Sequence, residues 1–158
     1  MKRVIGLLLL LGCTVAYCQP EKKTSGDPWQ GTFKLDTAKS KFAGNAPKDE
    51  TVTVDSATKS SVKYMIKGTD AQGNAYTVSF DGKVGSESPQ VMNGNTVAQV
   101  TYQMPSTREF TSQSKGSDGT SSTGKVTLSK DGKTITVQEK IKDASGTAHD
   151  QSAVYVRQ

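Results

Sequence analysis

The residues of this chain that could carry out catalysis are few, and their positions in the sequence keep them apart. The single histidine, His149, is followed by Asp150 and then by Ser152, which are the residue types of a nucleophilic triad. They fall in a segment with the alternating pattern of a strand, where neighbouring side chains point to opposite faces. His149 and Asp150 therefore do not converge as a triad requires, and we expect an exposed histidine beside a hairpin.

Two glutamates on predicted strands could form the carboxylate pair that glycoside hydrolysis needs. Glu109 alternates with the apolar Phe110, so its side chain is expected to face water. Glu139 shares the parity of Val137 and Ile141, which would point it inward. A strand end, a bulge or a lysine partner across the sheet explains such a position without catalysis. The sequence predicts a protein that is not an enzyme.

Metal and cofactor sites have little support in the residue types. Zinc requires clustered Cys, His or carboxylate ligands, and beyond the N-terminal segment the chain has one histidine and no cysteine. Asp143 and Asp150 are isolated and lack the spacing of a calcium loop. The glycines stand at turns between strands rather than in a phosphate-binding loop before a helix. We expect no metal and no cofactor.

The N-terminus has the pattern of an export signal. Lys2 and Arg3 precede an apolar run at residues 4–11, which is too short to cross a bilayer as a helix. We expect a cleaved signal peptide at residues 1–18, a flexible leader at 19–28, and no transmembrane span in the mature protein. The predicted location is periplasmic or secreted.

A second interpretation of this segment is a lipoprotein signal. Residues 10–13 read Leu-Leu-Gly-Cys, which resembles a bacterial lipobox. Lipid would then be attached to Cys13, and the mature chain would be tethered to a membrane.

The charge of the chain does not indicate nucleic-acid binding. The formal net charge is +5, but the lysines are scattered and no stretch of five or more basic residues occurs. A nucleic-acid-binding surface would show a basic stripe with interleaved aromatic residues. A solvated, lysine-rich surface explains the same charge.

From residue 29 onward the hydrophobic period is close to two, which predicts a single all-β domain over residues 29–158. Val62, Tyr64 and Ile66 alternate with polar residues, for example, so one face of the strand is apolar. Nine candidate strands follow from this pattern: 29–35, 50–56, 61–68, 75–83, 96–104, 107–114, 121–129, 133–142 and 148–157.

The connections agree with an antiparallel meander. Asp131-Gly132 and Asn93-Gly94 predict tight type I′ hairpin turns. The loops at 70–75 and 143–148 resemble each other and are interpreted as equivalent hairpin loops. Asp36 could cap a single helical turn, and residues 84–95 form the longest irregular stretch.

Such a meander of about eight or nine strands closes most simply into a barrel, because closure removes exposed edges. A β-sandwich is the alternative. The polar faces of nearly all strands argue against a membrane-spanning barrel.

The first strand carries a family resemblance. Residues 31–36 read Gly-Thr-Phe-Lys-Leu-Asp, and residues 39–42 read Lys-Ser-Lys-Phe. This is similar to the Gly-Thr-Trp-Lys-Leu-Asn opening, with its trailing Lys-Ser-Lys-Phe, of small exported bacterial proteins described as lipocalin-like. The wider lipocalin superfamily has Gly-x-Trp on the first strand and often a basic residue on the last strand, packed across that Trp.

The resemblance implies an eight-stranded barrel with an apolar cavity. Phe33 stands at the Trp position, so the residues expected to close the barrel are Gly31, Phe33, Arg157 and Trp29, four residues upstream of Phe33. We expect a small apolar or amphipathic ligand. The side chains expected to line its site are Tyr64, Tyr76, Phe80, Tyr102 and Met104, with loop 84–95 covering the mouth.

The same aromatic side chains could instead fill a solid core, as they can in a barrel of eight strands. The protein would then be an interaction or structural module without a cavity. Its partner would be another envelope protein or a polysaccharide, bound by Ser/Thr-rich stretches such as 111–114 and 120–123.

Overall fold

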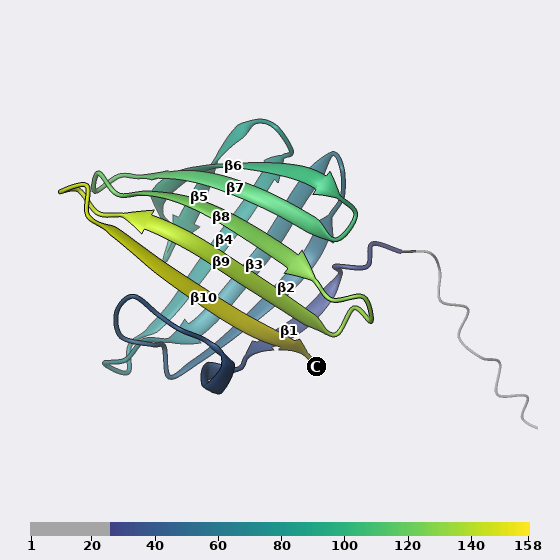
Figure 1. Ribbon diagram of the computed structural model, residues 1–158, viewed down its shortest axis with the longest axis horizontal. Helices are drawn as coiled ribbons and strands as arrows, with labels where there is room; N and C mark the ends of the chain where they lie inside the picture. The colour runs from purple at the N-terminus through teal and green to yellow at the C-terminus, as the bar shows by residue number, and fades with distance from the viewer. Residues whose placement is uncertain (1–25) are drawn as a thin grey trace, which may run out of the picture.

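The protein is an all-β barrel of ten antiparallel strands (Figure 1). The computed structural model describes residues 26–158, so the predicted signal peptide, the predicted lipidation at Cys13 and most of the predicted leader lie outside the described residues. The strands are β1 (Gly31–Leu35), β2 (Asp49–Ala57), β3 (Ser61–Thr69), β4 (Ala75–Lys83), β5 (Glu87–Met92), β6 (Asn95–Ser106), β7 (Glu109–Gly116), β8 (Ser121–Leu128), β9 (Thr134–Lys142) and β10 (Ala148–Arg157).

Each strand pairs with the next one in sequence, and β1 closes the barrel against β10. In this closing ladder Phe33 is opposite Arg157 and Leu35 is opposite Tyr155. The predicted up-and-down barrel is therefore confirmed, and the alternative β-sandwich is wrong. In Figure 1 strands β6–β10 lie in front of strands β2–β5.

The number of strands is ten, and the predicted eight or nine is wrong because residues 84–95 contain β5. This strand reverses the usual polarity: Val91 and Pro89 have the parity of the outer face, while the polar Gln90 faces inward, so the sequence shows no amphipathic alternation. Pro89 cannot donate a ladder hydrogen bond. The β4–β5 ladder ends at the pair Phe80–Gln90, so Pro89 is not part of it.

The barrel has a regular inside and outside. Lysines and threonines dominate the outer positions of most strands, and the buried residues are apolar. This buried core consists of Trp29, Phe33, Leu35, Val54, Ala57, Val62, Phe80, Val100, Phe110, Leu128, Ile135, Ala153 and Tyr155. The alternation of the sequence therefore corresponds to the two faces of one closed sheet.

The turns follow the predictions in part. Asn93 and Gly94 both have positive φ, 49° and 84°, as a type I′ turn requires. The predicted type I′ turn at Asp131-Gly132 is wrong, because Gly132 alone has positive φ there and its N–H bonds to the carbonyl of Ser129. A three-residue turn that ends in glycine needs only one residue in that region.

Helical structure between residues 26 and 158 is limited to a 3-10 turn at Thr37–Lys39, where Asp36 accepts a hydrogen bond from the Lys39 N–H as predicted. No helix in this part of the chain is long and apolar enough to cross a membrane.

Candidate functional site

One end of the barrel is closed by aromatic side chains. Trp29 is 2% exposed and contacts the edge of the Phe110 ring, with the ring centroids 5.2 Å apart. Its indole N–H donates a hydrogen bond to the carbonyl of Thr107 at 3.0 Å. Asp27 accepts hydrogen bonds from the backbone N–H groups of Trp29 and Ala57. The segment before β1 is thus fixed across the end of the barrel.

Arg157 lies beside this plug, with its guanidinium 4.3 Å from the centre of the Phe33 ring. It donates hydrogen bonds to the carbonyls of Gly132 at 2.7 Å, Gln30 at 2.6 Å and Pro28 at 2.8 Å. Gly31 has φ +144°, and a Cβ at this position would overlap the guanidinium. The structure therefore brings Trp29, Gly31, Phe33 and Arg157, the residues expected to close the barrel, together at one end.

A cavity of about 390 Å³ lies within the barrel on the inner side of this plug. Aliphatic side chains from β2, β3, β4, β8 and β9 form much of its wall. They are Val52, Val54, Val62, Ile66, Val78, Val126, Ile135 and Val137. Trp29 and Phe110 line it from the closed end. The structure therefore has a cavity in the middle of the barrel.

Three of the five expected lining residues contact this cavity: Tyr64, Tyr76 and Tyr102. Phe80 and Met104 do not line it, which corrects the prediction. Phe80 is 3% exposed, stacks on Tyr64 and meets the Tyr102 ring edge-on at 5.1 Å. Met104 packs against the same buried core. Both have inward parity, but they lie in the packed part of the barrel.

A belt of polar residues runs across five neighbouring strands, β6 to β10. The register places the belt residues side by side in the order Tyr102, Ser112, Gly124, Glu139 and Gln151. The amide of Gln151 donates to Oε2 of Glu139 at 2.7 Å. A Cβ on Gly124 would meet the Ser112 hydroxyl at 2.5 Å and Cγ of Glu139 at 3.3 Å. A glycine at this position therefore leaves room for the glutamate inside the barrel.

The belt continues on the other side of the cavity. The hydroxyls of Tyr64 and Tyr102 are 3.1 Å apart, and the Gln90 amide donates to the Tyr64 hydroxyl at 2.8 Å. Burial raises the pKa of both tyrosines, and the charge of Glu139 acts in the same direction. Both phenols therefore stay neutral hydrogen-bonding groups at neutral pH.

The polar belt separates two hollows inside the barrel. Gln90, Tyr102, Ser112 and Glu139 also line a second, more polar hollow of about 320 Å³. This hollow extends toward the β7–β8 turn, where Asp118 and other polar side chains line it. Glu139 therefore borders the apolar cavity on one side and a polar space on the other.

Glu50 is a second acidic side chain on the cavity wall, and it accepts hydrogen bonds from the hydroxyls of Tyr76 and Tyr155. Gly68 lies between Glu50 and Tyr76 in the ladder. A Cβ there would meet the Tyr76 hydroxyl at 2.7 Å, so the glycine lets the tyrosine reach across β3. Burial, and then the carboxylate of Glu50, raise the pKa of both tyrosines.

Four further polar residues line the cavity and were not predicted from the sequence: Glu50, Gln90, Gln151 and Tyr155. For Glu50 a signal was present, since it shares the parity of Val52 and Val54. Glu139 does face inward, as its parity predicted. It occupies a regular ladder position beside Gln151 rather than a bulge, and its hydrogen bond comes from an amide and not from a lysine.

The mouth of the cavity is lined by the segment between β1 and β2, not by residues 84–95 as expected. Phe42 and Pro47 of this segment line the cavity. Lys41 forms a two-hydrogen-bond bridge with Ser152, each bond 2.7 Å long. In Figure 1 the segment is the navy loop that folds beside β10. Residues 84–95 form part of the barrel wall instead, because they contain β5.

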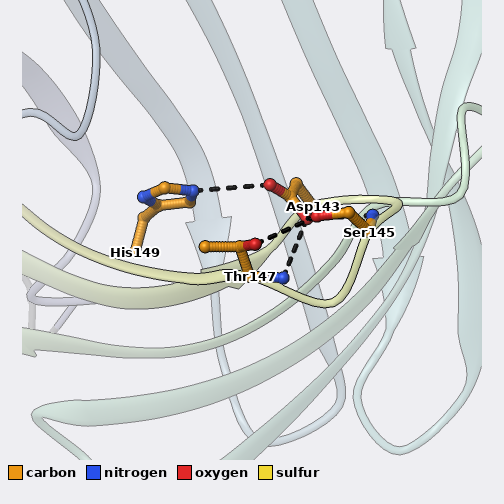
Figure 2. A network of polar contacts seen from close by, with 4 residues as sticks. All are labelled: Asp143, Ser145, Thr147 and His149. Carbon is orange, nitrogen blue, oxygen red and sulfur yellow. Dashed lines mark hydrogen bonds and ion pairs between the residues drawn. The ribbon is translucent and has the colours of Figure 1, made fainter.

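The imidazole of His149 lies next to Asp143, as Figure 2 shows, whereas Asp150 pairs with Lys140. Its Nε2 is 3.6 Å from Oδ2 of Asp143, and both side chains are well exposed. Ser145 donates to the other oxygen of Asp143 at 2.6 Å. Asp143 lies between Ser145 and His149 (Figure 2), so these three side chains do not have the order of a triad, in which the histidine lies between the serine and the aspartate.

No protein-family model and no curated protein matches the chain. Three similar solved structures are mFAP2b bound to DFHBI, a de novo designed fluorescence-activating β-barrel, and a redesigned β-barrel, mFAP1, bound to DFHBI. Their TM-scores are 0.48, 0.43 and 0.44, with sequence identities of 9%, 15% and 8%. The matches cover 83%, 82% and 83% of this chain, and 94%, 93% and 95% of theirs.

Proposed function

We propose that this chain is a non-enzymatic, lipocalin-like protein that binds a small apolar or amphipathic molecule inside the barrel. The observation that carries the proposal is the cavity of about 390 Å³, walled by valines and isoleucines and crossed by a few polar groups. Sites for small molecules have typical volumes of about 300–1,000 Å³ and this mixture of lining residues. The plug of Trp29, Phe33 and Arg157, at the position expected from the lipocalin resemblance, supports the same class.

The proposed site of action is outside the cytoplasm. This part of the proposal rests on the basic and apolar pattern of residues 1–18. The mass of the protein recovered from cell fractions is the test. A mature chain that begins after Cys18 supports export as a free protein, and a lipid-modified chain that begins at Cys13 supports the tethered form.

Ligand binding can be tested with N-phenylnaphthylamine, a neutral probe that fluoresces when it leaves water. Trp29 is the only tryptophan of the chain and lines the cavity. We therefore expect saturable probe fluorescence accompanied by quenching of tryptophan emission through energy transfer.

Two matched variants test whether the probe binds inside the barrel. Tyr102→Ala removes a cavity-lining ring, whereas Thr101→Ala changes its neighbour, which has the parity of the outer face. Probe affinity should change several-fold in Tyr102→Ala and stay the same in Thr101→Ala. Absence of saturable binding to the wild-type protein, or equal affinity in both folded variants, would refute binding inside the barrel.

A further inference from the structure

The cavity is acidic although the chain as a whole is basic. The formal net charge of the chain is +5, and lysines such as Lys63, Lys125 and Lys140 form ion pairs on the outer face. The charged side chains that line the main cavity are Glu50 and Glu139, and no lysine, arginine or histidine is among its lining residues within the described chain. Arg157 is held at the closed end by three backbone carbonyls.

The two glutamates differ in how many of their carboxylate oxygens accept hydrogen bonds from the protein. Each carboxylate oxygen of Glu50 accepts a tyrosine hydroxyl, Oε1 from Tyr155 and Oε2 from Tyr76. Glu139 has one donor, the neutral amide of Gln151, on Oε2. Within residues 26–158 no side chain donates to its Oε1, and no lysine or arginine forms an ion pair with it. Glu139 is therefore the carboxylate with free accepting capacity inside the barrel.

The surroundings of Glu139 fit a ligand with one polar end. Glu139 borders the apolar cavity together with Val137 of the same strand, and the Tyr102 ring lines the same space. Gly124, beside it in the ladder, leaves the space next to Cγ of Glu139 free of a side chain. An apolar body can thus occupy the aliphatic cavity while its polar end lies at the polar belt.

The charge of that polar end follows from electrostatics. A carboxylate on the wall of a largely apolar cavity attracts a cation and repels an anion more strongly than it would in bulk water. A hydrogen bond between charged partners is also stronger than one between neutral partners. The anionic head group of a fatty acid would add a third carboxylate to the cavity that Glu139 and Glu50 already line.

We infer that the barrel selects amphipathic amines, whose apolar body fills the cavity and whose ammonium group pairs with Glu139. This inference rests on the proposed function and deepens it, because it names the chemical class of ligand for the same cavity.

The test uses the purified protein loaded with N-phenylnaphthylamine and three competitors of one chain length: octylamine, octanol and octanoate. At pH 7 octylamine is a cation, octanol is neutral and octanoate is an anion. We expect octylamine to displace the probe at a concentration about tenfold or more below that of octanol, as one charged hydrogen bond predicts. Octanoate should be the weakest competitor of the three.

Two glutamate variants test whether Glu139 causes the preference for octylamine. Glu139→Gln should bring octylamine and octanol to within about twofold of each other, each compared with the affinity of the same variant for the probe. Glu109→Gln is the matched control, since Glu109 pairs with Lys125 at 2.8 Å on the outer face, and it should keep the wild-type order. Circular dichroism of each variant establishes that the barrel is folded.

The outcomes separate the two proposals. If the probe does not bind the wild-type protein, the proposed function fails. If the probe binds but octylamine is not the strongest competitor, which includes the case where none of the three displaces it, cavity binding stands and the inference of an amine ligand is overturned. An unchanged octylamine preference in folded Glu139→Gln would overturn the assignment to Glu139.

Discussion

At the scale of single residues, Arg157 connects three segments of the chain at the closed end. Its three hydrogen bonds reach carbonyls on the segment before β1 and on the β8–β9 turn, and its guanidinium covers Phe33. Arg157→Ala would leave three carbonyls without this donor and remove a cation–π contact. We expect a loss of about 2–4 kcal/mol in the free energy of unfolding, measured by urea denaturation.

Arg157→Lys separates the charge from the shape of this side chain. A lysine keeps the positive charge but has no planar fork to bond three carbonyls and stack on a ring at once, so most of the loss should persist. Lys34→Ala, a change on the outer face of β1, should have little effect. A wild-type free energy of unfolding in Arg157→Ala would contradict the role given to this residue.

Single residues also show what the sequence could predict about the site. Parity predicted that Tyr64, Tyr76, Tyr102 and Glu139 point inward, because a strand has only two faces. Parity does not give the height of a residue along the barrel axis, which depends on strand tilt and stagger. Phe80 satisfied the pattern and still lies in the packed core. The contact of Glu50 with Tyr155 depends on the register of β1 between β2 and β10, which parity does not determine either.

At the scale of elements, the hairpin loops at 70–75 and 143–148 are built alike, as predicted. Asp70 accepts from the N–H groups of Gln72 and Asn74, and Asp143 accepts from those of Ser145 and Thr147. The hydrogen bonds from Asn74 and from Ser145 are the main causes that lower the pKa of the respective aspartates. The two loops are therefore repeats of one turn structure on different strands.

The lowered pKa values give a direction to the pH dependence of stability. A carboxyl whose pKa is lower in the folded state stabilises the fold above its unfolded pKa of 3.8, and this contribution is lost as the pH falls through the folded value. Asp143→Asn keeps an accepting oxygen but does not titrate, so it should reduce the loss of thermal midpoint on acidification from pH 5 to pH 2. Asp70→Asn should act the same way.

Asp143→Ala is the contrasting variant for these loops. It removes the acceptor for two N–H groups, so we expect a lower thermal midpoint already at pH 7. An Asp143→Asn protein with the full acid sensitivity of the wild type would contradict the assignment of that sensitivity to the loop. His149, whose contact with Asp143 is exposed (Figure 2), should contribute little when changed to Gln.

Strands could be predicted where apolar and polar residues alternate in the sequence, and they were missed where this alternation is absent. The strands with apolar residues on one parity were all found, and the short turn capped by Asp36 was as well. β5 was missed because its inward residue Gln90 is polar and its outward residue Val91 is apolar. That reversal has a structural reason, since Gln90 belongs to the polar belt and bonds to Tyr64. The element that the pattern concealed is thus one that contributes to the site.

At the scale of the whole molecule, the barrel combines a packed end with a hollow middle. Closure of β1 on β10 leaves no free sheet edge, and the plug at Trp29 and Arg157 fixes one end. The cavity wall therefore does not need its centre filled in order to hold its shape. Because the plug that stabilises the fold is separate from the cavity, we expect that substitutions can change ligand binding without changing the stability of the fold.

That independence can be measured by thermal unfolding with and without ligand. A molecule that binds only the folded state, present at about 100 times its Kd, adds about 2.7 kcal/mol to the free energy of unfolding. For a domain of this size the thermal midpoint should rise by about 5–15 °C, here with N-phenylnaphthylamine as the ligand. A substitution that fills the cavity tests the same independence. Val137→Phe would place a phenyl ring in the cavity, next to Val126 and the small Ala153 in the ladder.

Because the added ring occupies empty space, we expect Val137→Phe to unfold at or above the wild-type midpoint without ligand and to lose the shift with ligand. Gln138→Phe carries the same ring on the exposed face of β9 and should keep the full shift. A ligand shift that persists in Val137→Phe would place the ligand elsewhere on the barrel. A strongly lowered midpoint of Val137→Phe alone would show that the middle is already packed, because added volume is destabilising only where no space exists.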